Sequence, residues 1–223
     1  MKMDNSFLKV LVNPSGFFQD AITKNENLKI PALIVLISAV VGAAAAYFIV
    51  TPTVTLMSGM LSGMGPVIVL AAVAAAFVIT LISWLLYAGI FYLVSILFHG
   101  KGSFNRTLEM IGYGFLPQIF GGLISLVVAM HYIPQVVVQA IPSGTQDSQV
   151  ILDATTSLMH DPAMMALTQT ITLISIVFLL WSANIWIFGI QYSRHLAVRD
   201  AALSVGLPVI LYIIYSIYKL GAL

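Results

Sequence analysis

Residues 30 to 100 contain no aspartate, glutamate, lysine or arginine, and this charge-free stretch restricts the fold more than any other feature of the chain. Three more charge-free runs follow, at residues 110–146, 162–193 and 201–218. Soluble domains are charged at about a quarter of their residues, whereas this chain is 8% charged and 60% hydrophobic. Apolar stretches of about 18 residues or more are typical of membrane-spanning helices. The sequence therefore predicts an all-α integral membrane protein that crosses the bilayer several times.

The charge-free runs predict five spans in a single membrane domain, 1–223. One helix over the second run would be about 50 Å long, against about 30 Å of hydrocarbon. Two spans and a turn would need more than about 34 residues, so we expect one long tilted helix. The spans are expected at about 30–50, 66–98, 108–130, 168–191 and 202–220, with a cytoplasmic interfacial segment at 1–29 and an outer loop at 131–167.

The basic residues predict the orientation, because loops that stay in the cytoplasm are enriched in lysine and arginine. Eight of them lie in the N-terminal segment or in the 99–107 and 192–201 loops, and Lys219 alone opposes the trend. We therefore expect a cell-membrane protein with its N-terminus in the cytoplasm and its C-terminus outside. Nothing before the first span resembles a cleavable signal peptide, so we expect that span to be retained. The eight residues are Lys2, Lys9, Lys24, Lys29, Lys101, Arg106, Arg194 and Arg199.

Asn13 and Pro14 form the typical start of a helix, an N-cap followed by proline at the first helical position. The helix that they begin, at about 14–24, places Phe17 and Phe18 on one side and polar residues elsewhere. We expect this amphipathic helix to lie in the cytoplasmic interface rather than to cross the bilayer.

Few polar side chains lie inside the spans. Gln118 and Asn184 are expected near the middle of the third and fourth spans. Either amide can bridge two helices through a hydrogen bond worth about 1 kcal/mol, or can contact a transported solute. Pro117 and Pro208 interrupt the third and fifth spans, and each is expected to kink its helix or, as in some transporters, to open a substrate site.

Glu109 is an acidic residue at the inner boundary of the third span. It can pair with Arg106, one turn earlier, or with Arg194 across the cytoplasmic face. We expect an inner ion pair formed by these three residues; the alternative is a proton-coupling carboxylate.

Enzyme motifs are missing from the sequence. There is no H-E-x-x-H, no G-x-S-x-G and no phosphate-binding loop, and no span holds a pair of carboxylates. The chain has no cysteine, which excludes thiol catalysis and thiolate metal sites, and a net charge of +1 without a clustered basic face excludes a nucleic-acid footprint. We expect no catalysis, no cofactor and no bound metal. The only loose set of outer-loop ligands, which matches no known metal motif, is His131, Asp147, Asp153, His160 and Asp161.

Three short motifs in a fixed order resemble the Yip (Ypt/Rab-interacting protein) domain family, specifically its bacterial and archaeal branch. The resemblance implies the fold of the family. Its eukaryotic members are associated with Rab GTPases and with transport between endoplasmic reticulum and Golgi, but this chain lacks their long polar N-terminal domain and their Asp-Leu-Tyr-Gly-Pro stretch. The resemblance therefore implies no Rab function and no settled activity. The motifs are Asn13-Pro14-Ser15-Gly16-Phe17-Phe18, Gly100-Lys101-Gly102-Ser103-Phe104 and Gly112-Tyr113-Gly114-Phe115-Leu116-Pro117.

The glycine-rich motifs also have a physical interpretation that needs no family. Ser103 can cap the third span, Gly100 and Gly102 allow a tight turn before it, and Gly112 and Gly114 allow close backbone approach. We expect a non-catalytic scaffold or partner-binding protein, which contacts the bilayer and a membrane-protein partner or a second copy. The alternative is a small transporter or channel with a path near the two span amides. A tight, dry bundle would favour the first and a water-accessible path the second.

Overall fold

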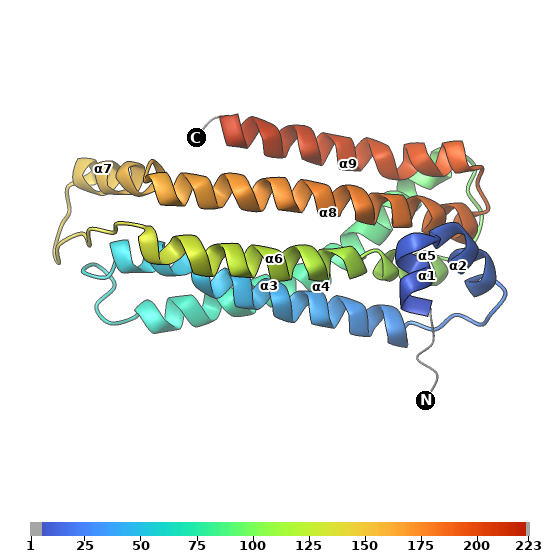
Figure 1. Cartoon of the computed structure of the whole chain (residues 1–223), viewed down its shortest axis with the longest axis horizontal. Coiled ribbons are helices and arrows are strands. Elements are labelled where there is room, and N and C mark those ends of the chain that lie inside the picture. The colour runs from blue at the N-terminus through green and yellow to red at the C-terminus, as the bar shows by residue number, and fades with distance from the viewer. Residues whose placement is uncertain (1–5, 222–223) are drawn as a thin grey trace.

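The computed structural model describes residues 6–221 and is drawn in Figure 1; Lys2, one of the basic residues counted for the orientation, lies outside this range. Every regular element in the described range is helical, and five segments are long and apolar enough to cross a membrane, which confirms the predicted all-α membrane bundle. These segments are α3 (Lys29–Leu56), α4 (Gly65–Leu97), α5 (Phe104–Tyr113) continued by α6 (Leu116–Tyr132), α8 (Pro162–Arg194) and α9 (Val198–Gly221).

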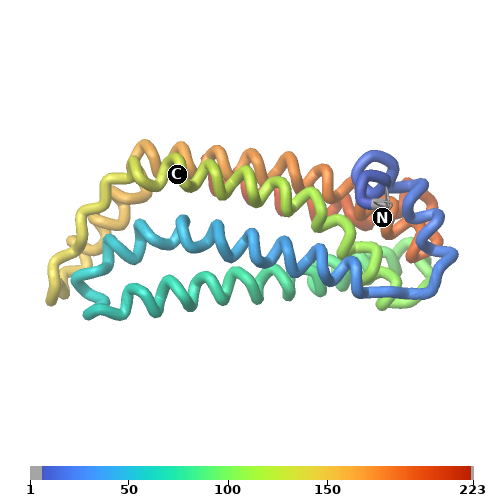
Figure 2. Tube along the Cα trace, turned by 60° about the horizontal axis from the view of Figure 1, so that its bottom comes forward, coloured from blue at the N-terminus to red at the C-terminus, as the bar shows by residue number. Residues whose placement is uncertain are grey.

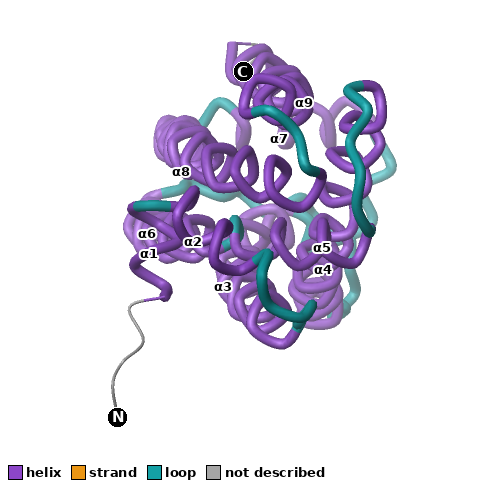
Figure 3. Tube along the Cα trace, turned by 90° about the vertical axis from the view of Figure 1, so that its right-hand side faces the viewer, coloured by secondary structure: helices purple, strands orange, loops and turns teal. Residues whose placement is uncertain are grey.

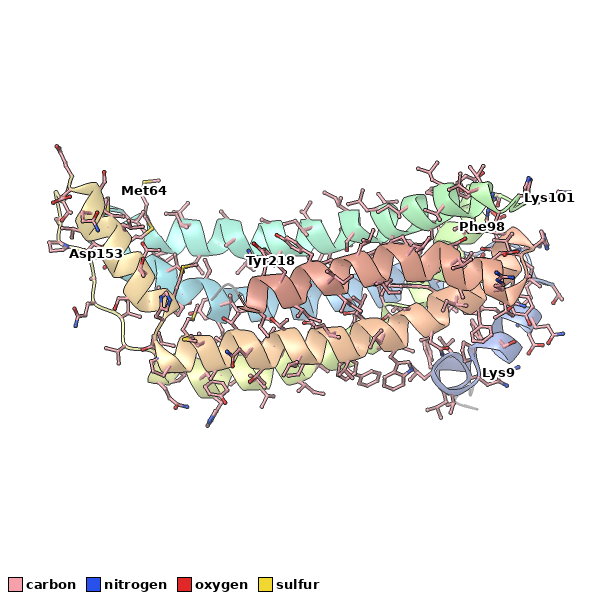
Figure 4. The ribbon with its side chains drawn as sticks, turned by 90° about the horizontal axis from the view of Figure 1, so that it is seen from above. Lys9, Met64, Phe98, Lys101, Asp153 and Tyr218 are labelled. Atoms are coloured by element: carbon pink, nitrogen blue, oxygen red, sulfur yellow. The ribbon has the colours of Figure 1, made fainter. Side chains whose placement is uncertain are left out.

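Short helices mark the two ends of the bundle. The helices α1 (Ser6–Val12) and α2 (Pro14–Ala21) lie at one end beside α5, and the 3-10 helix η1 (Ile133–Gln135) and α7 (Ser148–Met159) lie at the other (Figures 1 and 2). We call these the basic end and the α7 end. Figure 4 places Lys9 and Lys101 at the basic end and Asp153 at the α7 end.

The long helices form a closed ring. Going around it, α3 packs against α4, α4 against α9, α9 against α8, α8 against α6, and α6 against α3 again. Figure 3, which looks along the bundle from the basic end, shows the helices side by side in this arrangement. The helix α5 fills the ring at the basic end, where it contacts α3, α4 and α8. The seam between α4 and α9 is the least extensive contact of the ring.

The tightly packed core lies toward the basic end. Phe91, Ile111 and Trp186 are fully buried there together with Phe18 of α2. A second, much smaller apolar cluster lies under the loop at the α7 end. The outward surface of the long helices is apolar, as expected for helices that contact lipid.

Helix starts follow the capping signals in the sequence. The side chain of Asn13 accepts a hydrogen bond from the first turn of α2 at 3.0 Å, and that of Ser103 does the same for α5 at 3.0 Å. Asp161 caps α8 by accepting from two backbone N–H groups, at 2.9 and 3.1 Å. In contrast, α9 begins at Val198, so Asp200 lies within its first turn.

The structure differs from the expected elements in three places. The third span is interrupted between α5 and α6, and Pro117 lies in the first turn of α6, where a proline needs no hydrogen-bond partner and does not kink the helix. Pro208 does not interrupt the fifth span, because it lies inside α9, which runs from Val198 to Gly221 without a break. The N-terminal segment forms two helices instead of one, and Phe18 is fully buried against protein rather than lipid, because α2 packs on α8.

Candidate functional site

Arg194 ends α8 and is almost completely buried at the basic end, with 2% of its surface exposed. Its Nε donates to the hydroxyl of Ser95 at 2.8 Å and one terminal nitrogen donates to the carbonyl of Gly100 at 2.7 Å. The other terminal nitrogen donates to the carbonyl of Gly102. The guanidinium also lies 4.0 Å from the ring centre of Tyr92, a favourable cation–π distance. The arginine therefore fixes the loop between α4 and α5 to the end of α8.

The glycines of this loop are required by its close contacts with α8 and with the end of α4. The backbone at Gly102 has φ of +120°, and a Cβ there would lie 2.3 Å from the carbonyl oxygen of Ser193. A Cβ at Gly100 would lie 2.9 Å from the carbonyl oxygen of Ser95. The backbone N–H of Lys101 also donates to the carbonyl of the buried arginine, at 2.8 Å. This explains the glycine-rich motif as a packing motif.

The inner ion pair contains two of the three expected residues. Arg106 and Glu109 lie one turn apart on α5, with 2.8 Å between guanidinium nitrogen and carboxylate oxygen. Arg106 also donates to the backbone carbonyl of Lys24 at 2.6 Å, which ties the segment between α2 and α3 to α5. Arg194 takes no part, because its donors already bind the loop between α4 and α5.

Two tryptophans pack against the Gly112–Gly114 motif at the end of α5. The indole N–H groups of Trp84 and Trp186 donate to backbone carbonyls of α5 at 2.9 and 2.8 Å. A Cβ at Gly112 would lie 3.1 Å from Nε1 of Trp84, and a Cβ at Gly114 only 2.0 Å from Nε1 of Trp186. A Cβ at Gly112 would also lie 2.6 Å from Cβ of Pro31 on α3, so both positions require glycine.

Tyr113, between the two glycines, contacts the N-terminal helices. Its ring centre lies 4.9 Å from that of Phe17 and 6.1 Å from that of Phe18, both in edge-on geometry. The hydroxyls of Ser15 and Tyr192 are 3.1 Å apart and join α2 to α8. The family-like motifs at residues 13–18 and 112–117, far apart in sequence, therefore meet at the basic end.

Four aromatic side chains pack together inside the bundle near its basic end, and we call this cluster the aromatic plug. Its members are Tyr87, Phe91, Phe115 and Trp186. The ring of Trp186 lies 4.9 Å from Tyr87, 5.4 Å from Phe91 and 6.1 Å from Phe115, measured between centres. Tyr87 and Phe115 are 6.1 Å apart. Phe91 and Trp186 are fully buried, so the plug fills this part of the bundle with aromatic side chains.

A cavity of about 310 Å³ lies next to the aromatic plug, on the side away from the basic end. Tyr87 and Phe115 of the plug are part of its lining. All of the ring helices line it, and its lining has no charged residue. Gln118 lines it and donates its amide to the hydroxyl of Ser182 on α8 at 3.0 Å, a bridge between helices. The other polar side chains of the lining are Ser38, Thr80, Ser83, Tyr87, Ser125, Ser175 and Tyr212.

Asn184, the second span amide, lies elsewhere. It is exposed on the outer face of α8 and does not line the cavity. The structure therefore does not bring Gln118 and Asn184 together.

A larger pocket, of about 780 Å³, opens at the basic end between α1, α2, α5 and the start of α3. Its apolar wall includes the exposed side chains of Phe7, Leu8 and Val12, and its charged residues are two lysines and two carboxylates. We call it the N-terminal pocket. The charged residues are Lys9, Asp20, Lys24 and Glu109.

Two of the three acidic residues of the long loop serve as helix caps, and the third, Asp153, lies within α7 and accepts from the side chain of Gln149 at 2.8 Å. Asp147 accepts from the first turn of α7 at 2.8 Å, and Asp161 caps α8. Within residues 6–221, no group of three or more histidine, aspartate or glutamate side chains is arranged to hold a metal ion.

The sequence does not indicate the aromatic plug or the lining of the cavity. Ser125, Ser175 and Tyr212 lie among apolar residues of the spans. No local signal distinguishes a hydroxyl that faces a cavity from one that faces a helix neighbour, because the ring order of the helices decides it.

Comparison with known sequences identifies the family of this chain. The sequence profile of the Yip1 domain matches residues 8–219. An uncharacterized protein of the archaeon Methanocaldococcus jannaschii is 34% identical over 126 residues, which cover 56% of this chain and 89% of that protein. No solved structure matches. The match over almost the whole chain places the protein in the Yip1 domain family of multi-pass membrane proteins.

Proposed function

We propose that this protein is a non-catalytic member of its family that binds a membrane-protein partner at its basic end and acts as a scaffold in membrane organisation. The N-terminal pocket is the observation that carries the proposal. Its volume of about 780 Å³ is formed where the N-terminal helices rest on α5. Exposed apolar surface next to charged groups is typical of interaction sites.

The lining of the N-terminal pocket suits an amphipathic helix. Leu8 and Val12, one turn apart on α1, have 62% and 79% of their surfaces exposed and offer an apolar strip. Lys24 in the lining can pair with an acidic residue of the partner. A helix with an apolar face and an acidic residue beside it would cover the strip, as in groove-binding helices of other proteins.

The charge distribution supports an orientation with the basic end in the cytoplasm of the cell membrane. The basic end holds Lys9, Lys24, Lys101 and Arg106, whereas Asp147, Asp153 and Asp161 lie toward the α7 end. Cytoplasmic loops are enriched in lysine and arginine and such residues are attracted to anionic lipid headgroups.

Photo-crosslinking tests the proposal. A photoreactive phenylalanine analogue replaces Leu8 in the N-terminal pocket or, as the matched control, Val137, an apolar residue of 71% exposure toward the α7 end. We expect illumination of native membranes to give one discrete protein adduct from position 8 and none from position 137. A ladder of random adducts from both positions, or lipid adducts alone, would contradict partner binding at this pocket.

A second function, a small transporter or channel, is favoured by the polar cavity near Gln118. Such a path would exclude Asn184, which lies on the outer face of α8. Solute flux through liposomes that contain the purified protein, compared with protein-free liposomes, tests this alternative. Equal flux from both preparations would remove it.

A further inference from the structure

We propose that the cavity of about 310 Å³ binds an uncharged, hydroxyl-bearing group, supplied either by a small polyol or by the headgroup of a neutral lipid. This is the same cavity that favours the transporter alternative under the proposed function. Ligand binding and solute flux are measured in separate experiments, so a negative result in one does not decide the other.

Unpartnered hydroxyls are the first observation. Ser38, Ser125 and Ser175 line the cavity, and none of their hydroxyls has a hydrogen-bond partner among residues 6–221. Other helical hydroxyls, such as those of Ser204 and Ser216, bond to the backbone one turn earlier at 2.8 Å. A polar group inside a membrane protein costs free energy unless it is hydrogen-bonded. The three hydroxyls are open to the cavity, since none of them is among the buried polar atoms without a partner in residues 6–221, and each can bond to a group bound there.

The shape of the lining is the second observation. Ser175 faces the inside of the ring and yet is exposed, which means that the space in front of it is hollow. On α4 the buried residues are Ala88, Phe91 and Ser95, all near the basic end, so this helix is not covered beside the cavity. A volume of about 310 Å³ would hold about ten water molecules or a small ligand.

The absence of charge defines the class of ligand. No charged side chain lines the cavity, and the charge-free run at residues 110–146 spans its α6 side. A charged ligand would lose its hydration without gaining an opposite charge. A neutral polyol instead donates to and accepts from hydroxyls, which can do both.

The boundaries of the cavity indicate how the group reaches it. The aromatic plug closes the side toward the basic end. Tyr212 of α9 lines the cavity and is 52% exposed at the α4–α9 seam, the least extensive contact of the ring. Access is therefore from the lipid through this seam or from the α7 end.

Cysteine labelling tests the proposal, and the full chain has no cysteine of its own. The variants are Ser175→Cys in the cavity and, as the matched control, Val177→Cys, about 200° around the same helix on its outward face. The purified proteins in detergent react with the uncharged reagent hydroxyethyl methanethiosulfonate. We expect Ser175→Cys to react about tenfold faster, since a thiol in apolar surroundings rarely ionises. Equal rates would overturn the proposal, because the cavity would be dry.

Ligand protection then identifies the group. Glycerol, dioleoylglycerol and dioleoylphosphatidic acid are each added during labelling of the Ser175→Cys variant. We expect a neutral probe near saturation to slow labelling by about threefold or more: glycerol if the source is a free polyol, only dioleoylglycerol if it is a lipid headgroup. Ser125→Ala in the same background should reduce the protection, whereas Ser216→Ala, outside the cavity, should not. No protection by either neutral probe, or equal protection by the phosphatidic acid, would overturn the proposal.

Discussion

The guanidinium of Arg194 binds three acceptors that lie more than 90 residues earlier in the chain: a side-chain hydroxyl on α4 and two loop carbonyls. Three donors in one rigid plane meet three acceptors, and a ring lies against the face of the plane. A lysine ammonium at the end of a flexible chain cannot reproduce this geometry. The planar guanidinium therefore contributes hydrogen bonds in fixed directions as well as a positive charge.

We predict that Arg194→Lys lowers the free energy of unfolding by about 2 kcal/mol or more, because buried loop carbonyls lose their donors. The midpoint of thermal unfolding in detergent measures the effect. Arg199→Lys is the control, since Arg199 is exposed near the same end of the bundle and should tolerate the change. Equal midpoints for both variants would mean that the loop does not depend on Arg194.

Gly114 allows a second residue-scale prediction. A Cβ there would lie 2.0 Å from Nε1 of Trp186. We expect Gly114→Ala to lower the free energy of unfolding by about 1–3 kcal/mol, the usual cost of overpacking. Gly206→Ala on α9, where nothing lies within 4 Å of the added Cβ, should have no effect or a slightly stabilising one. Thermal unfolding of the pair is the measurement, and a Gly114→Ala protein as stable as Gly206→Ala would contradict the packing.

At the scale of single elements, the sequence predicts well whatever depends on local rules. The charge-free runs mark the long helices, and the N-caps at Asn13, Ser103 and Asp161 mark where helices begin. These features require only neighbouring residues, so one sequence suffices to place them.

Features that depend on contacts between distant helices could not be predicted. The burial of Phe18 follows from the position of α2 on α8, and the two indole hydrogen bonds to α5 depend on tryptophans of α4 and α8. Gln118 lies against Ser182, 64 residues later, and lines the cavity only because α6 and α8 are neighbours in the ring. Asn184 has the same chemistry but lies outside the ring.

The two N-terminal helices are joined by an ion pair between Lys9 and Asp20. The hydrogen bond and the charge of Lys9 hold the pKa of Asp20 below its usual value of 3.8. Because the pKa of Asp20 is lower when α1 is docked, the ion pair stabilises the docked state at pH values above the ordinary pKa. This stabilisation is lost as the pH falls through the lowered pKa. Docking of α1 should therefore weaken at acid pH and stay constant near neutrality.

Hydrogen exchange of the α1 amides, corrected for intrinsic rates, measures this docking. We expect faster exchange as the pH falls from about 5 to about 3, modest in size because the pair is exposed. Asp20→Asn should remove the dependence on pH, whereas Asp153→Asn on α7 should leave it unchanged. A dependence that survives Asp20→Asn would show that another group is responsible.

The whole molecule is asymmetric along its long axis. The basic end combines the buried core, the plug, the Arg194 contacts and the N-terminal pocket. The cavity lies toward the opposite half of the bundle. In Figure 4, α9 ends near Tyr218, well before the α7 end, where Met64 and Asp153 lie. The densely packed basic end is suited to binding a partner protein, and the half that holds the cavity is suited to binding a small ligand.

Native mass spectrometry of the full chain, released from its own membrane with minimal removal of lipid, tests partner binding most directly. The proteins compared are the wild type, the double variant Leu8→Glu with Val12→Glu, and the control Val137→Glu. We predict a complex with a partner protein in a fixed ratio for the wild type and the control, and loss of that complex in the double variant. A bare monomer from all three, or a complex that survives the double variant, would contradict it.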